Sequence, residues 1–115
     1  MSQKQTLNIA RDFSREPIGR YRTDGSTSGE VFREDRLAPA LRDAETIEVI
    51  LDGTEGYGSS FLDEAFAGLL RLGHLKRGEF GKRVRLVSND DPSLIEEISS
   101  YVAQEEARSS THSKI

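Results

Sequence analysis

The sequence of 115 residues contains no cysteine and no tryptophan, and only two of its residues are histidines. The absence of cysteine excludes disulfide bonds, thiol catalysis and the cysteine-rich sites that hold structural zinc. The sequence also has no apolar run near the roughly 20 residues that span a membrane. No apolar signal core follows Met1. We therefore expect a cytoplasmic protein.

The composition is polar, with 35% hydrophobic and 31% charged residues, but the apolar residues are concentrated in a few patterned runs. Such runs distinguish a folded domain with polar ends from a disordered chain. A chain of this length fits one domain with its own core. We expect a flexible N-terminus at residues 1–5, one domain at 6–107 and a disordered tail at 108–115. The formal net charge of −4 disfavours direct binding of nucleic acid, which requires a strong positive field.

Four segments have the pattern of β-strands. Ile47 to Leu51 is almost entirely apolar, which is typical of a central strand that is covered on both faces. Thr6 to Phe13 alternates polar and apolar residues, and Ile18 to Arg22 is predicted to return beside it as a hairpin. Arg83 to Val87 supplies the last predicted strand.

Three other segments have apolar residues at helical spacing. The first begins near Thr27 or Ser28. Thr27 is predicted to form a capping box with Glu30, and Pro39 should end or kink this helix. The second is predicted to begin with Ser60 as its N-cap and to end at Gly73.

The third helical pattern follows Asp91 as N-cap, with Pro92 at the first helical position. Helices and strands therefore alternate over most of the chain. This order predicts an α/β sandwich with a mixed sheet of about four strands and about three helices.

Several of these segments together carry a recognisable pattern. In chain order they are Asp24-Gly25-Ser26-Thr27-Ser28-Gly29-Glu30-Val31-Phe32-Arg33, Leu37-x-Pro39, Val49-Ile50-Leu51-Asp52-Gly53 and Gly58-Ser59-Ser60-Phe61-Leu62-Asp63-Glu64-Ala65-Phe66. The pattern resembles the prokaryotic STAS-like domain family of unknown function. The hallmark of that family resembles a hydrophobic strand ending in Asp, a short turn with Gly, and Ser-Phe-x-Asp-Glu. The resemblance runs from about Leu7 to the last helix and implies a small STAS-like sandwich.

The resemblance extends, at a distance, to the STAS domains of anti-sigma-factor antagonists. In those proteins the turn after the equivalent strand carries Asp-Ser-Ser/Thr-Gly. A kinase that is also the anti-sigma factor phosphorylates the serine and so breaks the complex. Ser59 stands at the phosphorylated position here, while Gly58 replaces the aspartate and Phe61 replaces the glycine.

The resemblance therefore implies a non-catalytic, regulatory protein-interaction module with Ser59 as a candidate phosphoacceptor. The candidate partner-binding residues are Ser59, Ser60, Phe61, Asp63 and Glu64. The partner implied is a protein, either a kinase-like ATPase or a transcriptional regulator.

These serines also have a purely structural interpretation. Ser60 as N-cap, with Asp63 as the matching carboxylate, would stabilise the helix by about 1 kcal/mol. The negative charges of Asp63 and Glu64 would complement the helix dipole. In that case Ser60 is committed to the cap, and Ser59 remains the better candidate for phosphorylation.

The loop before the first helix is the second candidate site. Two arginines, a glycine-rich backbone and a helix N-terminus are the ingredients of an anion or phosphate site. The candidate residues are Arg20, Arg22, Gly25, Ser26, Thr27, Ser28 and Gly29. Because the loop lacks the Gly-Lys-Ser/Thr ending of a P-loop, NTP hydrolysis is not indicated. The alternative function is therefore a small-ligand, nucleotide or phosphate-binding module, and the structural alternative is a simple capped loop.

Residues for catalysis are sparse. Ser59, His74 and Asp52 could be combined as a triad, but the helix that separates Ser59 from His74 would be roughly 20 Å long. His112 lies in the predicted tail, so a metal site would have one ordered histidine and no cysteine. We therefore expect no enzyme activity, no metal and no cofactor.

Overall fold

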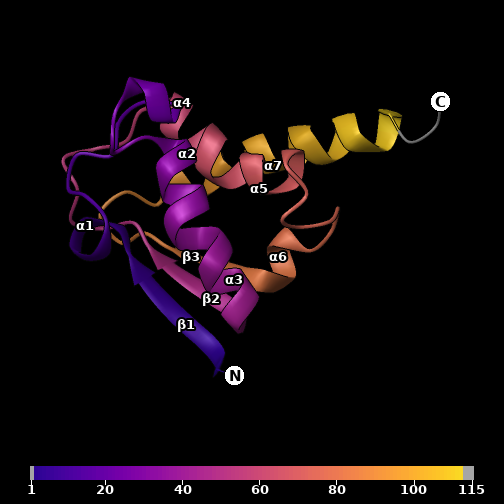
Figure 1. The fold of residues 1–115 in the computed structure, drawn as a ribbon, viewed down its shortest axis with the longest axis horizontal. Helices are drawn as coiled ribbons and strands as arrows, with labels where there is room; N and C mark the ends of the chain where they lie inside the picture. The colour runs from indigo at the N-terminus through magenta and orange to yellow at the C-terminus, as the bar shows by residue number, and fades with distance from the viewer. Residues whose placement is uncertain (1, 113–115) are drawn as a thin grey trace.

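The computed structural model describes residues 2–112 and shows a parallel three-stranded sheet with helices packed on one face (Figure 1). The strands are β1 (Ser2–Asn8), β2 (Ala44–Ile50) and β3 (Val84–Val87), in the order β1-β2-β3. The register aligns Leu7 with Val49 and Val49 with Leu86. The α/β class is therefore confirmed, whereas the predictions of a mixed sheet of about four strands and of about three helices are wrong, because the described residues form three parallel strands and five helices.

The predicted hairpin is absent from the described residues. Strand β1 begins at Ser2, so it includes residues that we expected to be flexible, and a single helical turn, α1 (Ile9–Asp12), follows it. Ile18 to Arg22 does not form a strand, because its backbone bonds the start of the next helix: Ile18 donates to the Thr27 carbonyl, and the Gly19 and Arg20 carbonyls accept from later N–H groups. A short 3₁₀ turn, η1 (Arg22–Asp24), completes this connection.

Within the described residues, helices cover one face of the sheet and leave the other open. Ile47, Val49 and Leu51 point into the core and are almost fully buried, whereas Glu48 and Ile50 alternate with them and stay partly exposed. The expectation that this strand is covered on both faces is therefore wrong for residues 2–112.

The first long helix runs without a break through three parts: α2 (Gly29–Phe32), the π-helical turn η2 (Arg33–Leu37) and α3 (Ala38–Asp43). Its N-cap is Ser28, whose Oγ accepts from the Val31 N–H at 3.3 Å. The predicted capping box of Thr27 and Glu30 is wrong, because the Glu30 carboxylate accepts instead from the Arg22 N–H at 2.7 Å. The helix also continues past Pro39, since the π turn widens it immediately before this residue.

The second long helix has the same three-part form: α4 (Ser59–Leu62), the π-helical turn η3 (Asp63–Ala67) and α5 (Gly68–Arg71). Its N-cap is Gly58, which has no side chain to cap the helix. Ser60 is therefore not the N-cap that the sequence predicted, and both serines lie within the first turn.

The chain continues through a single helical turn, α6 (Phe80–Arg83), to the last helix, α7 (Ser93–His112). The Asp91 carboxylate accepts from the Ser93 N–H, so it supports this helix start one residue later than predicted. Helix α7 extends into the segment that we expected to be a disordered tail; Met1 and residues 113–115 lie outside the described residues. Across residues 2–112, no helix has the length and apolar character needed to cross a membrane.

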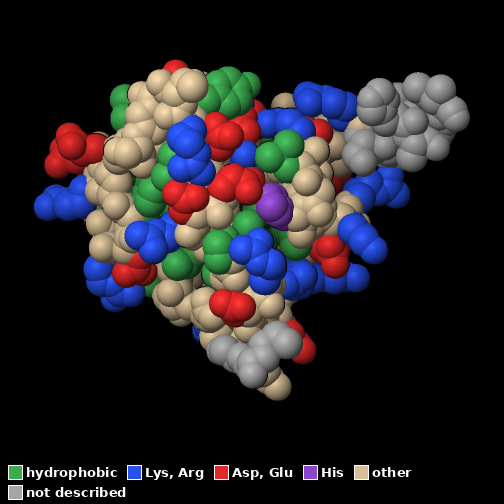
Figure 2. All heavy atoms as spheres, viewed as in Figure 1, with side chains coloured by type: hydrophobic (Ala, Val, Ile, Leu, Met, Phe, Trp, Pro, Cys, Tyr) green, Lys and Arg blue, Asp and Glu red, His purple; other side chains and the backbone are tan. Residues whose placement is uncertain are grey.

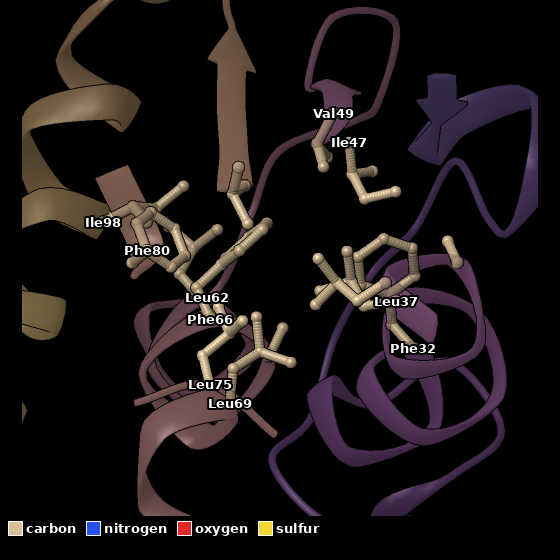
Figure 3. Close-up of a cluster of buried hydrophobic side chains, with 14 of the residues drawn as sticks. Phe32, Leu37, Ile47, Val49, Leu62, Phe66, Leu69, Leu75, Phe80 and Ile98 are labelled. Atoms are coloured by element: carbon tan, nitrogen blue, oxygen red, sulfur yellow. The ribbon is translucent and has the colours of Figure 1, made fainter. Parts of the chain in front are cut away.

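The core lies between the covered face of the sheet and the two long helices, and α7 packs against the second of them (Figure 1). Figure 3 shows side chains from both helices pointing toward one another and toward the strands. The fully buried members include Leu37, Ile47, Val49, Leu62, Phe66, Leu69 and Ile98. This packing fixes the two long helices side by side, and their contact forms the candidate site.

Candidate functional site

The two long helices touch at glycines. A Cβ added to Gly29 would lie 2.6 Å from the Phe61 carbonyl oxygen and 3.0 Å from the Ala65 nitrogen. A Cβ added to Gly68 would collide with the Arg33 guanidinium. The absence of side chains at both positions therefore lets the helices approach closely and lets Arg33 lie between them.

Arg33 is buried, with 1% of its surface exposed. Its Nη1 donates to both the carbonyl oxygen and the carboxylate of Glu64 at 2.7 Å, and its Nε donates to the Glu34 carboxylate at 2.7 Å. No sequence motif pointed to Arg33 as a site residue. The available signal was its position on the apolar stripe of its helix, in line with Leu37 and Leu41.

Further arginines extend this buried pair toward the surface. The second oxygen of Glu64 lies 3.2 Å from Arg20 and 3.4 Å from Arg71. Arg20 also donates to Asp63 at 2.7 Å, which raises the pKa of the Arg20 guanidinium. We call the whole set the arginine–carboxylate network; its members are Arg20, Arg33, Arg71, Arg108, Asp63, Glu64 and Glu105.

The network reaches helix α7 through Glu105. Its carboxylate accepts from Arg71 of α5 and from Arg108 of α7, each at 3.0 Å. Only 8% of the Glu105 side chain is exposed, whereas 65% of the Arg108 side chain is exposed. The Arg71–Glu105 ion pair therefore joins α5 to α7, and its carboxylate is shielded from solvent. Arg108 binds the same carboxylate from the exposed side.

A cavity of about 270 Å³ opens beside this network, and we call it the Ser59 cavity. Ser59 is exposed at its edge and contacts the Tyr101 phenol. The Tyr101 hydroxyl donates to Glu97 at 2.6 Å, which is the main reason why the pKa of Tyr101 is raised. The lining residues are Arg20, Ser59, Asp63, Arg71, Tyr101, Gln104, Glu105 and Arg108.

The structure separates the predicted partner-binding residues into two groups. Ser59 and Ser60 are exposed, and Asp63 is partly exposed. Phe61 is 0% exposed and Glu64 is 5% exposed, because the first belongs to the core and the second to the buried ion pair. The prediction that Phe61 and Glu64 offer a surface to a partner therefore needs correction.

The arginine and glycine loop does not form a single site. Arg20 points toward the Ser59 cavity, whereas Arg22 pairs with Asp35 at 3.0 Å. Arg22, Gly25 and Ser26 line a different cavity of about 580 Å³. Thr27 lines a third cavity, while Ser28 and Gly29 are buried against the helices. The structure thus brings Arg20 and Ser59 to the same cavity, although the sequence patterns had placed them in two separate candidate sites.

The residues that could be combined as a triad have separate partners. The His74 ring Nε2 lies 2.8 Å from the Glu34 carboxylate. Burial alone would raise the pKa of Glu34, but hydrogen bonds from Arg33 and His74 hold it below its usual value. The Asp52 carboxylate accepts from the N–H groups of Asn89 and Asp90.

Comparison with known proteins gave one match. A family model described as a STAS-like domain of unknown function matches residues 28–94, which is more than half of the chain. The matched segment contains both long helices, β2, β3 and the serines before η3. No curated protein and no solved structure gave a match.

Proposed function

This chain belongs to the family of STAS-like domains of unknown function, and we propose that it is a non-catalytic regulatory module controlled by phosphorylation of Ser59. In this proposal the unmodified domain binds a protein partner through the surface around Ser59 and Ser60. The partner is a kinase-like ATPase or a transcriptional regulator. Phosphorylation of Ser59 breaks that complex.

The observation that carries the proposal is the position of Ser59 beside three arginines. Arg20, Arg71 and Arg108 line the same cavity as Ser59 and come from three different parts of the chain. A phosphoserine carries about −1.5 to −2 charges near neutral pH. Arginine is the side chain best suited to bind phosphate, because its planar guanidinium donates two parallel hydrogen bonds.

Phosphorylation would also change the existing ion pairs. Arg71 now binds Asp63 and Glu105, and Arg108 binds Glu105. A phosphate on Ser59 would compete with these carboxylates for the same guanidinium groups. Because the Arg71–Glu105 pair joins α5 to α7, this competition would change the surface that both helices present to a partner.

The direct test is capture of partners from the source organism by immobilised chains that carry phosphoserine at a chosen position. We expect the unmodified chain to retain a specific protein. The phospho-Ser59 chain should retain at least about tenfold less of that protein, because an unfavourable charge contact costs several kcal/mol of binding free energy. Phosphoserine at Ser26 is the matched control. Ser26 is also exposed, but it lines a different cavity and lies outside the proposed partner surface, so capture should be largely kept.

Two outcomes would count against the proposal. Equal capture by the unmodified and phospho-Ser59 chains would remove the switch and leave partner binding alone. Failure of every chain to retain a specific protein would remove partner binding as well.

A further inference from the structure

The two ends of strand β3 are flanked by segments of opposite charge. Residues 76–85, which lead into and begin β3, contain five Lys or Arg and one Glu. Residues 88–97, which follow β3, contain four Asp or Glu and no Lys or Arg. Because the sheet is parallel, the amino ends of all three strands share one edge and the carboxyl ends share the other.

The basic edge is the one formed by the amino ends of the strands and α6. Lys76, Arg77 and Lys82 are exposed there, and Arg42 lines a shallow cavity with Lys82. Figure 2 shows Lys and Arg side chains gathered on the side of the molecule where Figure 1 places α6. Leu72, just before this segment, is an exposed apolar side chain with 55% of its surface accessible.

The acidic edge is formed by the loops after β2 and β3. A cavity of about 290 Å³ lies there, and the acidic residues in its lining are Asp52, Glu55, Asp90, Asp91 and Glu97. Its lining contains no Lys or Arg. A neighbouring cavity of about 520 Å³ shares Glu55 and Tyr57 with it and adds Pro17 and Ile18. This edge therefore offers an apolar hollow with carboxylates on its rim, one of which, Glu55, also lies 3.9 Å from the exposed Arg15.

We infer that copies of this chain associate head to tail, with the basic edge of one copy on the acidic edge of the next. The exposed apolar side chain of Leu72, followed along the chain by the exposed Arg77 and Lys82, matches an apolar hollow that carries Glu55 and Asp90 on its rim. Interfaces commonly combine an apolar anchor with complementary charges around it. The two edges lie on opposite sides of the molecule in Figure 1, so one copy can hold two neighbours at once.

The contact joins two different surfaces, so it is heterologous and leaves one unused surface at each end of an assembly. The expected behaviour is association that increases with protein concentration and decreases with salt, because the charges are exposed. Ser59 takes no part in this contact, so self-association and the proposed phosphorylation switch can succeed or fail independently.

The experiment measures mass by sedimentation at low salt for the wild type and for two double variants. The first variant, Arg77→Glu/Lys82→Glu, makes the basic edge acidic; the second, Glu55→Lys/Asp90→Lys, makes the acidic edge basic. Arg83 and Asp91 are left unchanged, because Arg83 donates to the Leu41 carbonyl at the end of α3 and Asp91 supports α7. For each variant alone, the association constant should be at least about tenfold lower than for the wild type.

An equimolar mixture of the two variants should restore association. The mixture pairs an acidic surface with a basic one at every contact, whereas each variant alone presents like charges. Leu72→Ser should weaken association of the otherwise unchanged chain. A wild type that stays monomeric at low salt and high concentration, or a mixture that stays as monomeric as its components, would overturn the inference.

Discussion

Replacing Arg33 by methionine should lower the free energy of unfolding by about 3–5 kcal/mol, which is the usual cost of breaking a buried ion pair by removing one partner. The substitution leaves the Glu64 carboxylate buried without its closest cation and removes the donor to the Glu64 carbonyl. Urea unfolding followed by circular dichroism measures the loss. An unchanged urea midpoint would contradict the presence of a buried Arg33–Glu64 ion pair.

The matched control is the same change at an exposed pair. About half of each side chain in the Arg22–Asp35 pair is accessible to solvent, so Arg22→Met should leave the unfolding midpoint within experimental error. A second comparison uses the double variant Arg33→Met/Glu64→Leu. It should be more stable than Arg33→Met alone, because an apolar pair replaces an unpaired buried charge.

Adding a single methyl group at Gly29 should destabilise the domain by about 1–3 kcal/mol. Alanine normally stabilises a helix relative to glycine. A loss of stability would therefore come from the contact between the two helices and not from helix propensity. The added Cβ would lie 2.6 Å from the Phe61 carbonyl oxygen, which belongs to the facing helix backbone and cannot move aside as a side chain could. Thermal or urea unfolding of Gly29→Ala measures the effect.

Gly81 provides the control for this prediction. It also lies in a helix, α6, but a Cβ added there would meet no atom within 4 Å. Gly81→Ala should therefore be neutral or stabilising by up to about 1 kcal/mol. If Gly29→Ala were as stable as Gly81→Ala, the close approach of the two helices would be wrong.

Sequence patterns identified the elements that bury apolar side chains. The strand around Ile47 and Val49 and the helix that contains Phe66 and Leu69 are confirmed. A short apolar run rich in β-branched residues favours a strand, and apolar residues at helical spacing favour a helix. The same patterns missed that β1 pairs in parallel with β2. Alternation at Leu7 shows that a strand has one buried face, but it does not show which strand lies beside it.

The predicted N-caps of both long helices were wrong, by one residue at the first helix and by two residues at the second. Several hydroxyl groups stand in a row at the start of each helix, so the sequence offers more than one N-cap. At the first helix Ser28 takes the cap, and the carboxylate of Glu30 is drawn away by the backbone of Arg22. Tertiary contacts therefore determine which residue caps the helix, and these contacts cannot be predicted from the local sequence.

The candidate site was predicted only in part for the same reason. Ser59 was proposed from the resemblance to STAS domains, and Arg20 from its glycine-rich surroundings. Their meeting depends on the side-by-side packing of the two long helices and on α7, which brings Tyr101 and Arg108 to the same cavity. Contacts between residues more than forty positions apart, such as Arg20 with Asp63, cannot be derived from spacing alone.

The central claim is that arginines of the Ser59 cavity hold a phosphate on Ser59, and phosphorus NMR of the phospho-Ser59 chain tests it most directly. The titration of the phosphate should occur at a pH about one unit lower in the folded domain than in the same chain unfolded in urea, because nearby cations favour the doubly charged form. Arg108→Gln should move the folded value back toward the unfolded one. Identical titration in the folded and unfolded chains would contradict the claim.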